Sequence, residues 1–423
     1  MILILGLGKS GIAAKKLLED NGKDCIIYDD NNRVEIDYDI VEYAVASPAF
    51  KDDHPVIEEL KKRNIKIISE IELAYRYSNS NKIIAVTGTN GKTTTTKILG
   101  DIIKSPNYKA GNIGIAWSKL CKKYEIAVLE VSSFQLDRID SFRPNVAIIT
   151  NIAPDHIDYH GGFEEYKKAK LKIFKNQTKN DFLIVSKSLF DNDLKSIILD
   201  IAPQIYVFSV GSPVEKGIYS IDNNIYFKDG KEEKYIGSFD GIKLIGSHNK
   251  ENVLAAICAS LLIGEDIEYA FKKLRQFTPP RHRLEEVLNV NGVIFIDDSK
   301  ATNVHAVLAA LDAIDNNIIL LLGGSEKGEN FEDLFKSNAT IKKYILFGET
   351  GIRLKDTADR LNIKNYVLFS NFDGAIVHAV NVAKQGDTIL LSPACASFDE
   401  FGSYAERGDY FAKKIKEISS FLK

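Results

Sequence analysis

One segment of the chain has the residue types of a phosphate-binding loop. Residues 85–97 read AVTGTNGKTTTTK, so a glycine-bearing polar loop separates an apolar run from Lys92 and Thr93. Backbone N–H groups of such a loop cradle phosphate oxygens, the lysine meets the β- and γ-phosphates, and the hydroxyl holds Mg²⁺. The common pattern has a further glycine where this chain has Val86. The segment predicts use of a nucleoside triphosphate; the alternative is a surface turn that binds nothing.

Two further strand ends carry residues that could serve a metal ion. Glu130 follows the apolar run Ile126–Leu129, and His156 follows the run Asn145–Ile149 in the same topological position. A carboxylate at the end of a parallel strand beside a phosphate loop can bind Mg²⁺ directly or through water. His156 is a second candidate, as metal ligand or substrate donor. Without the neighbouring loop, Glu130 would be interpreted as a solvated turn residue.

Two residues of the following segment carry no such signal. From composition alone, Lys170 looks like one charge on the solvated face of an amphipathic helix within YKKAKLKIF. His160 has no comparable partner in the sequence and is predicted to lie at the surface.

A second glycine pattern lies near the N-terminus. Gly6, Gly8 and Gly11 match GxGxxG between a predicted strand and a helix, and Asp29 ends the next strand. The pattern requires close backbone approach to a diphosphate at a helix N-terminus, which UDP satisfies as well as NAD does. The Ser47-Pro48 turn lies at the same predicted sheet edge, where ligands gather. The alternative is a tight strand–helix turn without a ligand.

Parallel sheets are needed to position these motifs. Strand-like runs alternate with helical periods over most of the chain, which predicts an α/β fold with mostly parallel sheets. Linkers are expected at Ser78–Asn81 and at Thr278–Pro280, where two prolines end a helical run. We therefore predict three domains, 1–80, 81–279 and 280–423. The predicted strands lie near 2–5, 24–29, 41–46, 65–68 and 82–86, in runs that end at Glu130, Thr150 and Ser186, within a β-rich stretch at 204–246, and near 293–297, 317–323, 343–348, 365–369 and 388–392.

Composition argues against several classes of protein. The 423 residues include 55 basic and 58 acidic side chains, and no basic patch favours nucleic acid or an anionic membrane. The N-terminus resembles a short strand rather than a signal peptide, and no apolar run is long enough to span a bilayer. The four cysteines are widely spaced, as expected of free thiols in a reducing compartment. A soluble, cytoplasmic protein is expected, and we expect a monomer.

Eight motifs, in order along the chain, resemble those of the Mur ligases, the amide ligases of peptidoglycan synthesis. They are VTGTNGKTTT, LEVSSFQL, NIAPDHIDYH, YKKAKLKIF, SHNKENVLAA, RHRLE, DDSKATN and LLSPACASFDEF. The resemblance implies an N-terminal Rossmann-like domain that binds UDP, a central P-loop ATPase-like domain with a small β region, and a C-terminal Rossmann-like domain that closes over both. DDSKATN and SPACASFDEF resemble the D-glutamate-adding branch of the family.

The resemblance also implies an activity and its cofactors. An ATP-dependent ligase of this branch joins D-glutamate to UDP-N-acetylmuramoyl-L-alanine through an acyl phosphate. Two Mg²⁺ ions are expected. In family members the lysine that matches Lys170 is carbamylated with CO₂, which converts a cation into a metal ligand.

Site residues follow from the same resemblance. The catalytic residues are Lys92, Glu130, His156 and Lys170, and the metal ligands are Thr93, Glu130, His156 and carbamylated Lys170. ATP contacts are Gly88, Thr89, Asn90, Gly91, Lys92, Thr93, Thr94, Asn252, Arg283 and Asp298. The UDP-substrate contacts are Gly8, Ser10, Asp29, Ser47, Asn112, Ser132 and His156, and the D-glutamate contacts are Lys300, Thr302, Lys327, Ser397, Phe398 and Tyr404.

Three other functions remain open at this stage. Another Mur ligase or a folylpolyglutamate synthase-like ligase would share the phosphate loop but differ after about Arg281. An NAD-dependent oxidoreductase would use GLGKSG and leave residues 85–97 unexplained. A non-catalytic switch would bind ATP and release no phosphate.

Overall fold

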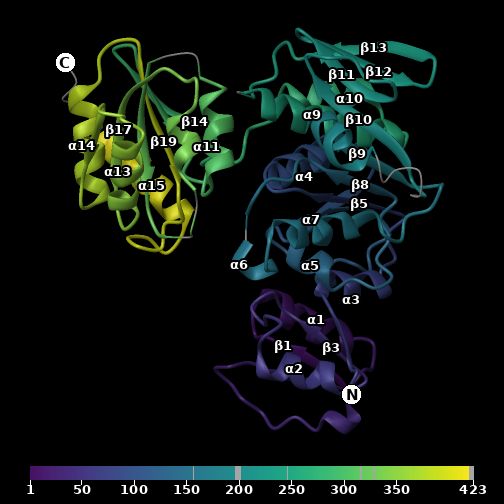
Figure 1. Ribbon diagram of the computed structural model, residues 1–423. Helices are drawn as coiled ribbons and strands as arrows, with labels where there is room; N and C mark the ends of the chain where they lie inside the picture. The colour runs from purple at the N-terminus through teal and green to yellow at the C-terminus, as the bar shows by residue number, and fades with distance from the viewer. Residues whose placement is uncertain are drawn as a thin grey trace. The chain divides into compact units, whose positions relative to one another are not determined.

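The computed structural model describes residues 1–155, 157–195, 202–244, 246–314, 317–326, 328 and 330–418, which form three sheets (Figure 1). The first sheet is parallel, with strand order β2-β1-β3-β4. Its apolar strands are β1 (Ile2–Leu5), β2 (Cys25–Tyr28), β3 (Tyr43–Ala46) and β4 (Lys66–Ile68). Helices α1 (Lys9–Glu19), α2 (Pro55–Lys62) and α3 (Glu70–Arg76) belong to this part of the chain.

The second sheet is the largest and has strand order β13-β12-β11-β10-β9-β8-β5-β7-β6. Strands β5 to β11 are parallel, and β11, β12 and β13 form an antiparallel meander at one edge. The strands are β5 (Lys82–Thr87), β6 (Asn107–Gly111), β7 (Ile126–Glu130), β8 (Val146–Ile149), β9 (Phe182–Ser186), β10 (Gln204–Val210), β11 (Gly217–Ile221), β12 (Asn224–Asp229) and β13 (Glu232–Ser238). The helices are α4 (Lys92–Ile102), α5 (Ser133–Asp137), α6 (Ile157–His160), α7 (Phe163–Leu171), α8 (Lys187–Leu189), α9 (Ser247–Leu262) and α10 (Ile267–Leu274).

The third sheet has strand order β14-β15-β19-β16-β17-β18, with only β14 antiparallel to its neighbour. Its strands are β14 (Glu285–Val290), β15 (Val293–Asp297), β16 (Asn317–Gly323), β17 (Ile341–Phe347), β18 (Tyr366–Leu368) and β19 (Asp387–Ala394). Apolar clusters cover both faces, with α11 (Val304–Leu311), α12 (Glu332–Phe335) and α13 (Gly351–Arg360) on one, and α14 (Phe372–Val382) and α15 (Tyr404–Ile418) on the other. This doubly covered parallel sheet confirms the predicted α/β class.

The chain separates into two compact units, 1–242 with 250–277, and 243–249 with 278–423. The break after Phe277 coincides with the predicted linker Thr278–Pro280. Within the first unit, α3 ties the first sheet to the second. The buried Glu72 carboxylate accepts hydrogen bonds from the N–H groups of Asp140 (2.9 Å) and Phe142 (2.8 Å). Because the contacts divide the chain into two units, the division into three domains stays a prediction.

Two strands are absent from the sequence prediction. Strand β6 is the sequence NYKAG, in which only Tyr108 and Ala110 point into the core, so it lacks a continuous apolar run. Strand β14, EEVLNV, lies at a sheet edge with mostly half-exposed residues. Edge strands with charged residues give a weak strand signal because only one face needs to be apolar.

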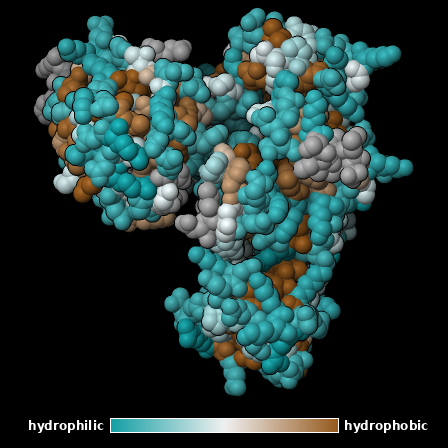
Figure 2. Space-filling view, in the orientation of Figure 1, coloured by the Kyte–Doolittle hydropathy of each residue, from teal (hydrophilic) through white to brown (hydrophobic). Residues whose placement is uncertain are grey.

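The character of the surface and the state of the cysteines match what the amino-acid composition predicts. Hydrophilic residues cover most of the visible face, with hydrophobic residues in scattered groups (Figure 2). In the described ranges, we find no helix with the length and apolar character that crossing a membrane requires. All four cysteines are free thiols, as predicted.

Candidate active site

The phosphate loop joins β5 to α4 and is held by the segment that follows β8. Gly88 has φ +147°, and a Cβ there would lie 1.9 Å from the Thr150 Oγ1 atom. The Thr89 N–H donates to the Asn151 carbonyl (2.9 Å), and the Asn90 N–H donates to the Asn151 side chain (2.9 Å). Only glycine fits this close approach. The loop leads into the N-terminus of α4, where backbone N–H groups can bind an anion.

Two lysines meet at this loop. The Lys92 Nζ donates to the carbonyls of Gly88 (2.7 Å) and Thr89 (2.8 Å), and the Lys170 Nζ donates to the same Gly88 carbonyl (2.7 Å). Lys170 is only 2% exposed. Burial, followed by the charge of Lys92, holds the pKa of Lys170 well below its usual value, although Asp155 and Glu130 act in the opposite direction.

The buried position of Lys170 overturns its interpretation as a solvated charge. Helix α7 buries Tyr166, Ala169 and Lys170, which lie on one face at helical spacing. The Tyr166 hydroxyl lies 3.0 Å from Thr89 Oγ1, and the Lys170 Nζ lies 4.6 Å from the centroid of the Tyr166 ring. Packing of α7 on the phosphate loop therefore buries a lysine that the local sequence presents as a surface residue.

Glu130 stands beside the loop because β7 pairs with β5, which sets Glu130 opposite Val86. Its Oε1 accepts a hydrogen bond from the Asn112 side chain (2.9 Å). Its Oε2 is buried and has no hydrogen-bond partner among the described residues. An unsatisfied buried carboxylate oxygen needs a cation or a donor, so the residues fit a hard metal ion. Thr93 is also buried at the start of α4, and His156 lies outside the described residues.

Asn252, a predicted ATP contact, lies beside the phosphate loop. It is buried on α9, and its Oδ1 accepts a hydrogen bond from Thr95 Oγ1 (3.2 Å). A Cβ at Gly91, which has φ +84°, would lie 2.3 Å from the same Oδ1 atom. Thr94 is buried in the first turn of α4.

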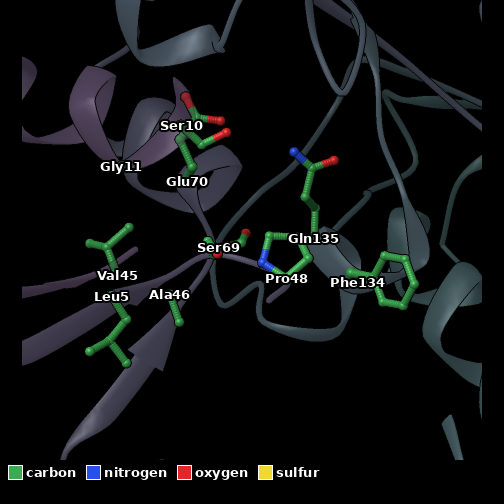
Figure 3. A pocket seen from close by; sticks show the side chains of 11 residues that line it. Leu5, Ser10, Gly11, Val45, Ala46, Pro48, Ser69, Glu70, Phe134 and Gln135 are labelled. Atoms are coloured by element: carbon green, nitrogen blue, oxygen red, sulfur yellow. The ribbon is translucent and has the colours of Figure 1, made fainter. Parts of the chain in front are cut away.

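A pocket within the first unit contains two of the predicted UDP-substrate residues, Ser10 and Ser47 (Figure 3). Ser10 and Ser47 line it from the carboxyl edge of the first sheet, and Phe134 and Gln135 line it from α5. Glu70 contributes a buried carboxylate, whose Oε1 accepts the Ser118 N–H (2.6 Å). Burial raises the pKa of Glu70. Hydroxyl groups beside a glycine loop suit a phosphorylated ligand.

Four other predicted UDP contacts, Gly8, Asp29, Asn112 and Ser132, lie among the described residues and have structural roles. The Asp29 carboxylate accepts the N–H of Leu7 (2.8 Å) and so supports the glycine loop itself. Gly8 is the N-cap of α1, and Ser132 is the N-cap of α5, where it forms a capping box with Gln135. Asn112 bonds to Glu130, which links this set to the phosphate loop.

In the second unit, Asp298 follows β15 and is buried. It accepts hydrogen bonds from Ser392 Oγ (2.8 Å) and from the Leu284 N–H (3.3 Å). Burial raises the pKa of Asp298 to about 7, although Ser392 and Arg283 lower it. The two predicted nucleotide residues, Arg283 and Asp298, thus interact electrostatically at one sheet edge.

Four of the predicted D-glutamate residues lie on segments that follow β15 or β19. The Lys300 Nζ lies 5.0 Å from the centroid of the Tyr404 ring, and the Thr302 N–H donates to the Lys300 carbonyl (2.9 Å). Ser397 is 1% exposed, and its Oγ has no hydrogen-bond partner among the described residues. Phe398 is 73% exposed, and Lys327 lies outside the described residues.

His160, predicted to lie at the surface without a partner, is half-buried and does have partners. The His160 Nε2 lies 3.0 Å from Ser133 Oγ, and its ring stacks on Phe134 with a centroid distance of 5.4 Å. No spacing in the sequence predicts this contact, because α5 and α6 approach each other only in the folded chain. Arg407, buried in α15, is a residue that the prediction did not consider.

Two family descriptions match the chain: "Mur ligase middle domain" over residues 86–260, and "Mur ligase, glutamate ligase domain" over residues 282–395. The UDP-N-acetylmuramoylalanine–D-glutamate ligase of Lachnoclostridium phytofermentans is 36% identical over 448 residues, which cover 99% of this chain and 98% of that protein. The ligase of the same name from Alkaliphilus metalliredigens is 35% identical over 449 residues, with 99% and 98% covered.

Solved structures show the same fold at lower identity. The MurF ligase of Thermotoga maritima in complex with ADP superposes with a TM-score of 0.61 at 18% identity and covers 98% of this chain and 95% of its own. A pseudomurein peptide ligase type C from Methanothermus fervidus gives 0.62 at 16% identity, with 99% of both chains covered. Together, the two matched domains and the full-length identity to curated ligases establish that the chain belongs to the Mur ligase family.

Proposed function

We propose that this protein is an ATP-dependent amide ligase that joins D-glutamate to UDP-N-acetylmuramoyl-L-alanine in the cytoplasm, as a step of peptidoglycan synthesis. One observation carries the proposal. Lys92, Lys170 and Glu130 converge on the phosphate loop, with both ammonium groups on the Gly88 carbonyl and one Glu130 oxygen unsatisfied among the described residues. The names of the curated relatives support the choice of substrates. The protein acts as a monomer in this proposal.

The reaction needs an activated carboxylate, because a free carboxylate is a poor electrophile at neutral pH. A carboxylate oxygen of the UDP-sugar substrate attacks the γ-phosphorus of ATP, the bond to ADP breaks, and an acyl phosphate forms. The D-glutamate amine then attacks the acyl carbon, inorganic phosphate leaves, and the ammonium loses a proton to give the amide. Lys92 and the N–H groups at the start of α4 neutralise charge on the transferred phosphoryl group.

Glu130 and Thr93 are described residues that would hold Mg²⁺, and His156 and carbamylated Lys170 complete the proposed set. Bound Mg²⁺ supplies Lewis-acid neutralisation of the phosphate oxygens. Lys170 has the environment for carbamylation, since its amine is buried beside a second cation and its pKa is lowered. The neutral amine would attack CO₂, form a C–N bond and release one proton, which leaves an anion facing Lys92.

The two organic substrates have separate sites in this proposal. The pocket lined by Ser10, Ser47 and Gln135 would take the UDP-sugar, with its diphosphate at the glycine loop. The strand-end segments of the second unit would take D-glutamate, with Lys300 as a cation and Ser397 as a hydroxyl donor for its carboxylates. Arg283 and Asp298 would contact the nucleotide.

Phosphate release tests the proposal. The purified protein is given ATP, Mg²⁺ and UDP-N-acetylmuramoyl-L-alanine, together with D-glutamate, L-glutamate, L-lysine, D-alanine or meso-diaminopimelate in separate reactions. D-Glutamate alone should support rapid release and yield the ligated product by mass spectrometry. Release with a different amino acid would show another ligase of the family, and binding of ATP without any release would show a switch.

A further inference from the structure

Arg407 is one of the largest fully buried side chains, with 1% of its surface exposed. Its guanidinium donates four hydrogen bonds: Nε to Ser299 Oγ (2.9 Å), Nη1 to the Ala396 carbonyl (3.0 Å), and Nη2 to the carbonyls of Ser299 (2.9 Å) and Cys395 (3.0 Å). All four acceptors are neutral. They belong to the segments that follow β15 and β19, which are adjacent parallel strands.

The same guanidinium packs against a third segment, which follows β16. A Cβ at Gly324, which has φ +137°, would lie 2.9 Å from Arg407 Nη1 and 2.1 Å from the Ala396 carbonyl oxygen. That carbonyl also accepts the Ser325 N–H (2.9 Å). Because β19 lies between β15 and β16, one side chain contacts the ends of three neighbouring strands.

Two of the residues that accept hydrogen bonds from Arg407 lie next to a residue proposed to hold D-glutamate. Ser299 precedes Lys300, and Ala396 precedes the buried Ser397. Ser299 Oγ in turn donates to the Tyr404 carbonyl (2.8 Å). The backbone here is strained, because Ala394 has φ +60°, and such a conformation persists only where its surroundings hold it.

The charge of Arg407 lacks a carboxylate in direct contact. The four hydrogen-bond acceptors are neutral, and no ion pair within 4.0 Å joins Arg407 to another described residue. Burial lowers the pKa of Arg407 to about 10, although Cys395, Asp399 and Asp297 raise it, so the group stays protonated at neutral pH. A buried cation without a counterion is costly, and an anionic ligand nearby relieves that cost.

We propose that Arg407 is a positioning and specificity residue of the D-glutamate site: it fixes the strand-end segments that carry Lys300 and Ser397, and its charge favours an acidic amino acid as the acceptor. The inference rests on the proposed ligase function. It does not require Arg407 to touch the substrate, since burial behind the two segments lets it act through their backbone and through its field.

Two variants separate geometry from charge. Arg407→Lys keeps the charge, but one ammonium cannot reach four acceptors in two segments, whereas Arg407→Met removes both charge and donors at similar length. The KM for D-glutamate should rise about tenfold in the first variant and further in the second. The KM values for ATP and the UDP-sugar should change by about twofold or less, as should the acyl phosphate trapped by hydroxylamine without D-glutamate.

Arg360→Lys is the matched control. Arg360 belongs to the same unit and forms a surface ion pair with Glu332 (2.8 Å), so its replacement should leave every KM unchanged. Melting curves check that each variant is folded. If Arg407→Met does not fold, Ser299→Ala removes the Nε acceptor and the hydrogen bond to the Tyr404 carbonyl, leaves the Arg407 charge in place, and should still raise the KM for D-glutamate.

A folded Arg407→Lys or Ser299→Ala with an unchanged KM for D-glutamate would overturn the proposal. An equal rise in the KM for ATP would do so as well, because it would indicate a general structural role. Failure of the proposed function looks different: the wild-type protein itself would then release no phosphate with D-glutamate.

Discussion

Replacement of Lys170 by alanine is the perturbation that tests the site most directly. Lys170 is 2% exposed, and its Nζ lies 2.7 Å from the Gly88 carbonyl, so the variant removes a group from the centre of the phosphate loop. Loss of one preorganised charge-stabilising group from such a site costs about 2.7–4 kcal/mol, or about 10²–10³ in rate. If the carbamate also orders a metal ion, the loss should reach several orders of magnitude.

The same contacts indicate that the variant folds. The lost hydrogen bond to Gly88 is worth about 1 kcal/mol, and the contact with the Tyr166 ring is worth about as much. Removal of a buried ammonium whose pKa is lowered by burial offsets part of this loss. The melting temperature of the variant therefore separates a catalytic defect from unfolding.

Chemical rescue gives the sharper assay. In Lys170→Ala the space left by the lysine stem should admit acetate or propionate, which would restore the missing carboxylate and part of the phosphate release. Lys170→Met fills the same space with an apolar chain, so it should be equally inactive and should resist rescue. Lys168→Ala is the control, since Lys168 is on the same helix but 65% exposed and paired with Glu165.

Unchanged turnover in Lys170→Ala would refute the assigned role, whatever the result of rescue. Equal rescue of the alanine and methionine variants would refute the idea that the carboxylate occupies the space of the lysine. Carbamylation would be supported if the wild type lost activity when CO₂ is removed and regained it when bicarbonate is added. Bicarbonate should have no such effect on Lys170→Ala.

Three further predictions concern catalysis and pH-dependent stability. Lys92→Ala should abolish ATP-dependent formation of an acyl phosphate, because the Lys92 ammonium is a positive charge at the phosphate loop. Trapping by hydroxylamine measures the acyl phosphate, and a hydroxamate still formed by the variant would contradict this role. Burial raises the pKa of Glu72, but hydrogen bonds led by Ser141 outweigh it and the pKa is lowered. Glu72→Gln should thus lower the free energy of unfolding by about 2–4 kcal/mol at pH 7 in urea titrations, with the difference shrinking as the pH falls below about 4.5. Burial raises the pKa of Glu251 from 4.5 to about 7, so the folded state carries a cost once the group ionises. Glu251→Gln should therefore stabilise the protein by about 2 kcal/mol at pH 8 and make no difference below about pH 4.5; equal stabilisation at both pH values would contradict the assigned cause.

The phosphate loop could be predicted from sequence because all of its parts are local. Residues 85–97 contain the strand end, both glycines and the lysine, and the structure places Gly88 and Gly91 at positive φ as a loop of this kind requires. Strand alternation likewise predicted the parallel sheets. The strands that were missed, β6 and β14, lie at sheet edges, and neither has a continuous apolar run.

Burial was not predictable in the same way. Lys170 and His160 lie in a segment whose sequence is that of a charged surface helix, and only the packing of α7 and α6 against the phosphate loop and α5 buries or engages them. The four hydrogen bonds of Arg407 join segments 108 and 11–12 residues away in the chain, a distance over which no local pattern operates. The sequence by itself determined the fold class, the phosphate loop and the family, because these depend on short-range patterns and ordered motifs. Tertiary structure alone decided which charges lose their water, and loss of water is what changes a lysine or an arginine from a solubilising group into part of a site.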